Sequence, residues 1–298
     1  MAKDKNNLIN INRVRPWKWA GCKKWLAPIM SQIWEQHSDR RWFDPFCGSG
    51  ALPFLLEPRQ ALLADANPYL ICSYEWVRAG AKRTIDFEMN QARYYELRSE
   101  FNQRRRNFQS KGDRLWLGEA LWLLNRSCHS GLWRTNGNGQ FNVGFGFYKK
   151  LSNVDFAPYI EMVKQWDIRH SSFRKSWCLV KPEDFLFLDP PYSEKFVSYT
   201  QDRFPWSEQV ELAKRAADHA GPVVICNSAT WSIVDLYSTY GFEIFYLQSD
   251  QHIRQGLRKV VHEVFATRNI KVSCWGGGKF RSVPDSLAAI PRQLMVQL

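Results

Sequence analysis

The sequence predicts an α/β fold whose sheet is mostly parallel, on three observations. Strand-like segments recur along the 298 residues with helical segments between them, which is the pattern of βα units. The last two strand-like segments are too close together for a crossover helix, so they should pair antiparallel. A long stretch, 78–165, breaks the alternation and predicts an inserted domain.

The expected strands are short, apolar segments. In chain order they cover 41–43, 61–64, 185–188, 223–226, 242–247 and 260–267. Residues 207–220 carry apolar side chains at helical spacing and end at Gly221-Pro222. They predict an amphipathic helix.

The inserted stretch has a composition of its own. It contains the run Arg104-Arg105-Arg106, an aromatic-rich helical segment around 115–124, and a Gly/Asn-rich stretch at 130–146. We therefore expect helices followed by a hairpin. The predicted organisation is one domain in two parts, 1–77 and 166–270, with the insertion 78–165 between them and a tail, 271–298.

The charge of the chain favours a polyanion as partner. The formal net charge is +12, the pI is near 9.4, and aromatic residues make up 15% of the chain. Basic residues gather in 1–25, in 120–154, where no acidic residue occurs, and in 251–281, where Glu263 is the one acidic residue. These clusters could line one nucleic-acid groove; the alternative is solvated charge spread over the surface.

Two other classes of protein are disfavoured. No run of about 18 apolar residues occurs, and the first residues lack the apolar stretch of a signal peptide, so we expect a soluble, intracellular protein. The seven cysteines are odd in number and form no C-x-x-C pair. This argues against both zinc and a disulfide framework.

The tetrapeptide Asp189-Pro190-Pro191-Tyr192 follows the apolar run 185–188 and predicts a rigid pocket for a flat molecule with an exocyclic amine. Asp189 and the Pro190 carbonyl can each accept a hydrogen bond from that amine. Tyr192 supplies a face on which a base can stack. The plainer interpretation is a Pro-Pro turn after a buried strand.

A second pattern, residues 43–50, predicts a site for a nucleoside-bearing cofactor. Gly48 and Gly50 follow a strand and precede a helix, so the backbone there can turn tightly and approach a ligand. Asp65 ends the next strand, where an acidic side chain accepts ribose hydroxyls in such folds. No third glycine has the spacing of a pyrophosphate turn, which argues against NAD. The alternative for Asp65 is a cap of the helix after Asn67-Pro68.

Five blocks in this order resemble the Dam-type (D12 class) N6-adenine DNA methyltransferases. They are Lys18 to Lys23, Asp44 to Gly50, Ala64 to Pro68, Asn125-Arg126 with Phe141 to Lys150, and Asp189 to Tyr192. The resemblance implies a Rossmann-like, S-adenosylmethionine-dependent methyltransferase sheet with an inserted helical and hairpin target-recognition domain. The chain departs from the family pattern at Cys22, where relatives have glycine, and at Asp44, where many have Glu.

The resemblance also implies roles for individual residues. The implied catalytic residues are Asp189, Pro190, Pro191 and Tyr192. The implied cofactor-binding residues are Trp19, Lys23, Phe46, Gly48, Gly50, Asp65, Phe173 and Asp189. The implied DNA-binding residues are Arg126, Arg134, Asn142, Lys149 and Lys150. Arg134 would read a guanine edge or, as the alternative, hold a phosphate. His129, Ser130 and Gly144 differ from the Dam pattern, so the site read is GATC or a related one.

The implied reaction is methyl transfer to an adenine amine that has left the DNA duplex. Asp189 and the Pro190 carbonyl would stabilise the positive charge that grows on the attacking nitrogen. Cys47 need not be a nucleophile, and no metal is required. The expected partner is double-stranded DNA, met by a monomer in the cytoplasm of a prokaryotic cell or phage-infected host. Methylation of cytosine N4 or of RNA, and a DNA-binding regulator without turnover, remain as alternatives.

Overall fold

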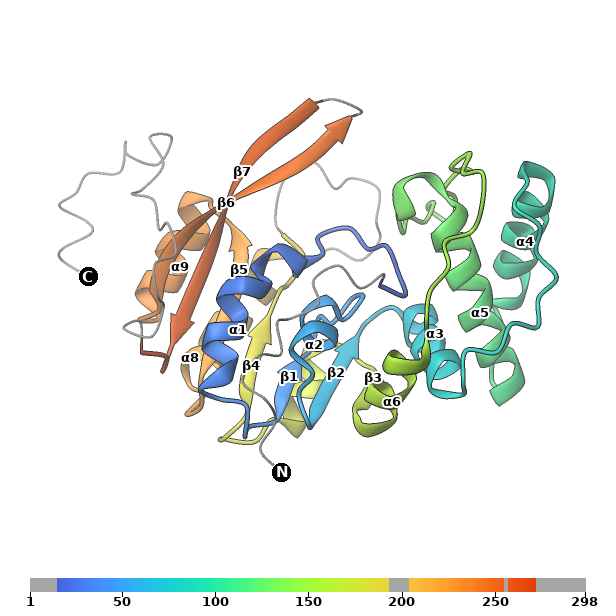
Figure 1. Cartoon of the computed structure of the whole chain (residues 1–298). Helices are drawn as coiled ribbons and strands as arrows, with labels where there is room; N and C mark the ends of the chain where they lie inside the picture. Colours follow the sequence, from blue (N-terminus) through green and yellow to red (C-terminus); the bar gives the residue numbers. More distant parts are fainter. Residues whose placement is uncertain (1–14, 193–203, 255–256, 272–298) are drawn as a thin grey trace.

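Figure 1 shows the fold in a computed structural model, which describes residues 15–192, 204–254 and 257–271. For 248–254 and 257–262 it describes the backbone alone. Within these residues, seven strands form one sheet in the order β3-β2-β1-β4-β5-β7-β6. They are β1 (Trp42–Asp44), β2 (Ala61–Asp65), β3 (Asp167–His170), β4 (Phe185–Leu188), β5 (Val223–Ser228), β6 (Glu243–Arg254) and β7 (Leu257–Arg268).

The predicted fold class is confirmed. β7 runs antiparallel to β5 and β6, whereas the four other strand pairs are parallel. β1 and β4 lie at the centre of the sheet, and each is buried along its whole length. Strands that are buried on both faces read as continuous apolar runs, which is why 185–188 was recognisable from the sequence.

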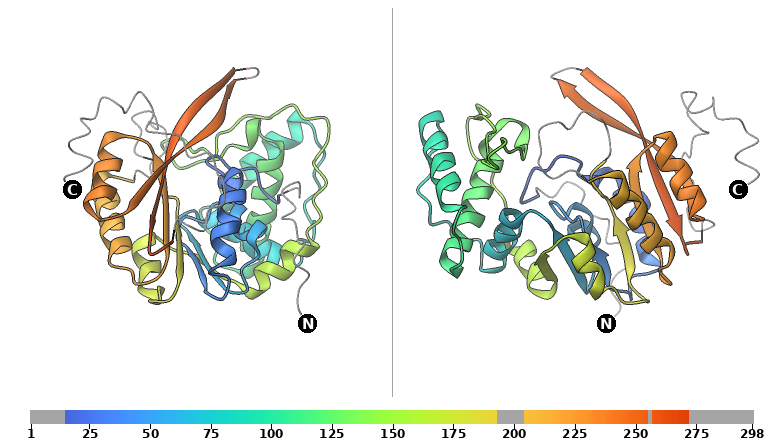
Figure 2. Two further views of the ribbon diagram at one scale, coloured as in Figure 1. Left: turned by 60° about the vertical axis from the view of Figure 1, so that its left-hand side comes forward. Right: turned by 180° about the vertical axis from the view of Figure 1, so that it is seen from behind.

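Helices cover both faces of the sheet (Figure 2). One core contains residues of α1 (Ala27–Glu35), α2 (Ala51–Leu56), α3 (Pro68–Arg78) and α6 (Ala157–Gln165). The other contains residues of α7 (Phe173–Ser176), α8 (Trp206–Ala217) and α9 (Trp231–Thr239). Neighbouring strand residues alternate between them: Trp42 belongs to the first core and Phe43 to the second.

Two elements differ from expectation. β3 was not predicted, because its residues are polar and mostly exposed at the edge of the sheet, where they pair only with β2 among the described strands. The helix expected at 207–220 begins at Trp206 and ends at Ala217. Short 3₁₀ turns complete the described part: η1 (Lys23–Leu26), η2 (His129–Gly131) and η3 (Trp177–Leu179).

The inserted stretch contributes α4 (Gln91–Arg104) and α5 (Lys111–Ser127), which stand beyond the β3 end of the sheet (Figure 1). α5 packs closely on α3: a Cβ at Gly118 would lie 2.2 Å from the carbonyl oxygen of Cys72. After α5, the expected hairpin is present as two isolated bridges, Cys128 with Phe145 and Thr135 with Phe141. α6 packs on α3, next to β3, rather than with α4 and α5 (Figure 1). The domain boundaries themselves stay a prediction.

The hairpin of β6 and β7 is longer than the sheet needs. Each strand has 12 residues, but β5 pairs only with 263–268 of β7. The outer half of the hairpin therefore extends past the carboxyl end of β5, as both views in Figure 2 show. None of the helices in the described part is long and apolar enough to span a bilayer.

Candidate active site

Asp189 follows β4 directly, between the carboxyl ends of β1 and β5. Its side chain is 18% exposed, and its Oδ1 lies 3.1 Å from the Nζ of Lys23. Lys23 is 6% exposed and comes from the turn before α1, so an N-terminal segment closes over the end of the central strand. The sequence-predicted Lys23 and Asp189 are therefore brought together.

Glu263 is a site residue that the sequence interpretation missed. Its Oε2 lies 3.4 Å from the Nζ of Lys23 and accepts a hydrogen bond of 2.7 Å from the hydroxyl of Tyr192. The Lys23 Nζ also lies 4.8 Å from the centroid of the Tyr192 ring. Glu263 reaches this place because β7 sets it opposite Ser228, at the carboxyl end of β5. Its signal in the sequence was its isolation as the one acidic residue of a basic stretch.

The protonation states follow from this arrangement. Burial raises the pKa of Asp189 to about 6, with the Lys23 charge acting in the opposite direction. Burial alone would lower the pKa of Lys23, but Asp189 and Glu263 outweigh it and raise that pKa. Burial and the two carboxylates raise the pKa of Tyr192 well above its ordinary value. At neutral pH the site thus presents a mostly ionised Asp189, a charged Lys23 and a phenol that donates.

Buried amides hold the Pro-Pro turn in place. The Nε2 of Gln209, on α8, donates to the carbonyl oxygen of Pro191 at 3.0 Å. The Oε1 of Gln209 accepts from the Nδ2 of Asn227 at 3.1 Å. Both amides are almost fully buried, at 1% and 0% exposure. Hydrogen bonds of this kind fix the turn from behind, so that Pro190 and Tyr192 keep their orientation.

The glycine turn and the end of β2 are joined by Asp65. Its Oδ2 accepts from the backbone N–H of Gly48 at 3.0 Å, and its Oδ1 accepts from that of Asn67 at 2.8 Å. The side chain of Asn67, not that of Asp65, caps α3. Gly48 and Gly50 have φ values of +47° and +61°, which glycine adopts without strain.

Trp19 forms a wall over the glycine turn. A Cβ at Gly48 would lie 3.0 Å from the Cδ1 of Trp19, so only glycine leaves the two surfaces free to approach. The ring of Trp133 is stacked against Trp19 at 6.4 Å between centroids. Trp19 thus contacts the cofactor half of the site and segment 128–150 together.

Three aromatic rings gather beside this turn. Phe46 lies 5.8 Å from Phe173 and 5.5 Å from Phe204, and the last two are 5.4 Å apart between centroids. Phe46 and Phe173 were expected here, whereas Phe204 was not. A flat apolar group such as a purine ring is the kind of ligand that such a set can hold.

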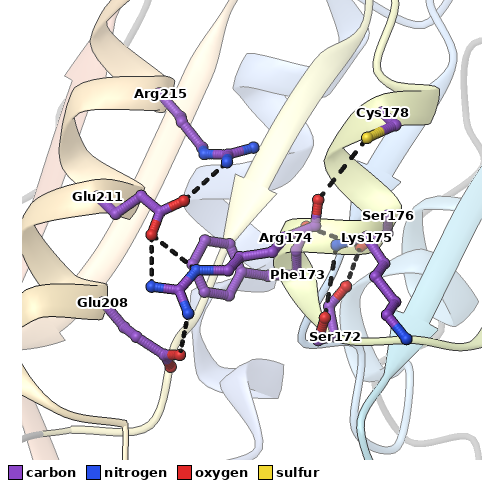
Figure 3. A network of polar contacts seen from close by, with 9 residues as sticks. All are labelled: Ser172, Phe173, Arg174, Lys175, Ser176, Cys178, Glu208, Glu211 and Arg215. Carbon is purple, nitrogen blue, oxygen red and sulfur yellow. Dashed lines mark hydrogen bonds and ion pairs between the residues drawn. The ribbon is translucent and has the colours of Figure 1, made fainter.

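The segment that carries Phe173 is fixed to α8 by charge (Figure 3). Arg174 donates to Glu211 at 2.7 Å and to Glu208 at 2.9 Å, and Glu211 also pairs with Arg215. The same α8 holds the Pro-Pro turn through Gln209. One helix therefore contacts both the segment that carries Phe173 and the Pro-Pro turn.

Carboxylates face one another across the ends of β1, β2 and β4. Burial raises the pKa of Asp44 well above its ordinary value, and Asp189 and Asp65 raise it further. The Oδ1 of Asp44 accepts from the N–H of Phe46 at 3.0 Å. A ligand that brings positive charge would relieve this repulsion, which suits a sulfonium cofactor.

The predicted DNA-binding residues fall into two groups. Arg134, Lys149 and Lys150 are exposed, and the Nε of Arg134 donates to the Oδ1 of Asn142 at 2.9 Å. Arg126 is only 6% exposed, and its Nη1 donates to the carbonyl of Arg15 at 3.4 Å. Burial lowers the pKa of Arg126. Its burial does not support a direct contact with DNA in this arrangement, and its role stays a prediction.

The profile of the D12 class N6 adenine-specific DNA methyltransferases matches residues 19–253. The chain belongs to this family. The predicted family and activity are thereby confirmed: it is an adenine-specific DNA methyltransferase with S-adenosylmethionine as cofactor.

Individual relatives agree with this assignment. Type II methyltransferase M1.LlaDCHI of Lactococcus lactis subsp. cremoris is 28% identical over 284 residues, 88% of this chain and 98% of that protein. Retron Ec67 DNA adenine methylase of Escherichia coli is 28% identical over 274 residues, 87% and 92% of the two chains. A solved precorrin-6y C5,15-methyltransferase from Geobacter metallireducens covers 87% of this methyltransferase and 94% of its own chain, at 8% identity. Its TM-score of 0.38 is too low to support a structural argument.

The residues present fit S-adenosylmethionine. The glycine turn presents bare backbone beside Trp19, since a Cβ at Gly48 would lie 3.0 Å from the Trp19 ring. Asp65 ends β2 beside that turn, the carboxylates suit a cation, and Phe46, Phe173 and Phe204 offer apolar faces. These residues come from separate segments and lie at the carboxyl ends of the strands, which is where ligands bind in open α/β folds.

Proposed function

We propose that this methyltransferase acts on an adenine that has left double-stranded DNA, and that Asp189 and the Pro190 carbonyl hold its N6 amine. The observation that carries the proposal is the placement of Asp189, which is ion-paired to Lys23 and followed by a turn that Gln209 fixes. A carboxylate in a preorganised site stabilises positive charge on a nearby nitrogen more than water does. Tyr192 then offers its ring to the base, because Glu263 holds its hydroxyl.

Each residue has a separate task in this proposal. When bound, S-adenosylmethionine supplies an electrophilic methyl group. Asp189 accepts a hydrogen bond from the amine, and with a pKa of about 6 it is also able to receive the proton that N6 loses. Lys23 keeps Asp189 ionised at neutral pH. Asp65 accepts the ribose hydroxyls, and Phe173 and Phe46 contact the cofactor's adenine.

DNA reading belongs to segment 128–150. Arg134 is exposed, and Asn142 holds its Nε, so its remaining guanidinium donors are oriented for a guanine edge. Lys149 and Lys150 hold phosphates and add affinity without selectivity. The site read is GATC or a related sequence. The enzyme works as a monomer, in the cytoplasm of a prokaryotic cell or phage-infected host.

The test is a methylation map. The enzyme is expressed in a host without adenine methylation, and the host DNA is sequenced with detection of modified bases. We expect N6-methyladenine in one short sequence, at every occurrence. Purified enzyme should transfer labelled methyl groups to the same site in duplex DNA more readily than to either single strand. Methylation of no defined site, or of cytosine, would contradict the proposal.

A further inference from the structure

Phe147 is the most exposed large apolar side chain of the described residues. It is 75% exposed, whereas the other exposed large apolar side chains range from 37% to 45%. An isolated surface apolar residue is ordinary. The backbone of Phe147 makes this one unusual.

Phe147 has a φ of +55°. Left-handed backbone costs a residue with a Cβ about 1–2 kcal/mol, and bulky residues rarely adopt it. A strained residue persists only where the surrounding structure imposes its conformation, and such residues gather at functional sites. The sequence thus places a Phe where glycine or asparagine would fold more easily.

The surroundings do impose this conformation. The N–H of Gly146 donates to the carbonyl of Ser127 at 2.8 Å, and the N–H of His129 donates to that of Gly144 at 2.9 Å. Phe145 bridges to Cys128. A Cβ at Gly146 would lie 2.6 Å from the Cys128 oxygen, so the chain is pressed against the end of α5. Phe147 therefore projects from a tightly held stretch of backbone.

Phe147 meets Phe145 edge-on at 5.3 Å between ring centroids but stays 75% exposed, whereas its neighbours pack against the protein. Phe145 is 8% exposed and lies 5.4 Å from the ring of Tyr94. The centroid of the Tyr148 ring lies 4.0 Å from the Nζ of Lys18, the residue that precedes Trp19. Asn125 fixes Lys18 through both its N–H and its carbonyl. The backbone that carries Phe147 is thus connected, through Lys18, to the segment that carries Trp19 and Lys23.

The charge around Phe147 identifies its partner as DNA. Lys149 and Lys150 are exposed two and three residues on, Arg134 is exposed on the same segment, and 120–154 contains no acidic residue. An exposed apolar ring on a segment that carries exposed cations and no acid suits a nucleic acid, whose bases stack on aromatic side chains. Resting on the proposed function, we propose that Phe147 stacks on a base of the duplex next to the target adenine and so favours its departure from the helix.

The test compares Phe147→Ala, Phe147→Trp and Phe147→Gly with wild type. Single-turnover methyl transfer is measured on two duplexes that carry the mapped site, one intact and one with an abasic position opposite the target adenine. Trp231→Ala, at an exposed aromatic residue of α9, serves as matched control.

A stacked base contributes about 1–3 kcal/mol, so Phe147→Ala should slow transfer on the intact duplex about fivefold or more. On the second duplex it should stay near wild type, because the adenine is already unpaired. Phe147→Trp should retain transfer on both.

Phe147→Gly separates function from folding. It removes the ring and the backbone strain together, so it should raise the melting temperature while it slows transfer on the intact duplex. Equal transfer by Phe147→Ala and wild type on the intact duplex would overturn the inference. Equal losses on both duplexes would also overturn it. If wild type methylates neither duplex, the proposed function fails instead.

Discussion

The candidate active site at the carboxyl ends of the strands, here called the catalytic edge, and segment 128–150 present their side chains in opposite ways. At the edge, Asp189 and Lys23 are mostly buried and form an ion pair, and Lys23 also pairs with Glu263. In segment 128–150, Arg134 and Phe147 project from irregular backbone and are exposed to solvent. The first arrangement fixes protonation states and geometry before any ligand arrives. The second fixes the backbone and, through Asn142, part of the Arg134 guanidinium, and leaves the rest of both side chains exposed.

This difference separates the expected effects of mutation. Changes at the edge should alter the rate, the pH dependence and cofactor affinity, with little effect on the choice of DNA sequence. Changes in segment 128–150 should alter DNA selection and leave cofactor affinity as it is. The predictions below test that separation.

The largest effect is expected at Asp189. Asp189→Ala removes the proposed acceptor for the attacking amine and should slow methyl transfer by about a hundredfold or more. Calorimetry should show that S-adenosylmethionine still binds. Asp235→Ala, at an exposed aspartate of α9, is the control. Transfer by Asp189→Ala within threefold of wild type would remove Asp189 from the mechanism.

Next in size is the effect of Arg134 on DNA selection. Arg134→Ala should cost about 1–3 kcal/mol of binding at the mapped site and almost nothing on random DNA. Lys149→Ala, the matched control, should weaken binding to both DNAs alike and reduce the slope of log affinity against log salt by about one. Titrations of both DNAs at several salt concentrations distinguish the two. Equal losses on both DNAs for Arg134→Ala would assign Arg134 to a phosphate.

Asp65 should affect the cofactor alone. Asp65→Ala removes a charged acceptor from the ribose hydroxyls and should weaken S-adenosylmethionine binding by about tenfold or more. It also frees the N–H of Gly48, so the melting temperature is measured in parallel. At saturating cofactor the DNA site should be unchanged. Unaltered cofactor affinity would leave Asp65 with the purely structural task of holding the turn.

The smallest effect is a shift in pH dependence. Because the pKa of Asp189 is about 6, the ionised form that accepts a hydrogen bond is lost as the pH falls below that value, by about tenfold per pH unit. The single-turnover rate should fall in the same way. The positive charge of Lys23 lowers the pKa of Asp189, so Lys23→Met should move this acid limb to higher pH. An unmoved limb would show that another group controls it.

Much of the catalytic edge could be predicted from the sequence, because its residues end apolar strands or stand in glycine turns. Asp189, Gly48, Gly50 and Asp65 have such positions, and the structure brings them to one edge. Glu263 and Gln209 could not be placed in the same way. Their roles depend on the register of β7 and on the face of α8, which no local pattern fixes.

Segment 128–150 was less predictable for a different reason. Its backbone is held by bonds to the end of α5, by side chains of α4 and by two isolated bridges, not by a repeating ladder. The left-handed φ of Phe147 leaves no signal in the sequence, because the residue there is not a glycine. β3 was missed since an exposed, polar edge strand lacks the apolar pattern.

The bonds between Lys18 and Asn125 join residues that are 107 positions apart in the chain. Contacts this far apart form late in folding, because the intervening chain must first be ordered. During synthesis on a ribosome, Lys18 therefore cannot form these bonds before Asn125 has emerged, and Lys23 cannot contact Glu263 before β7 has emerged. The contacts of Glu263 with Lys23 and Tyr192 are thus completed only when the last strand of the sheet is in place.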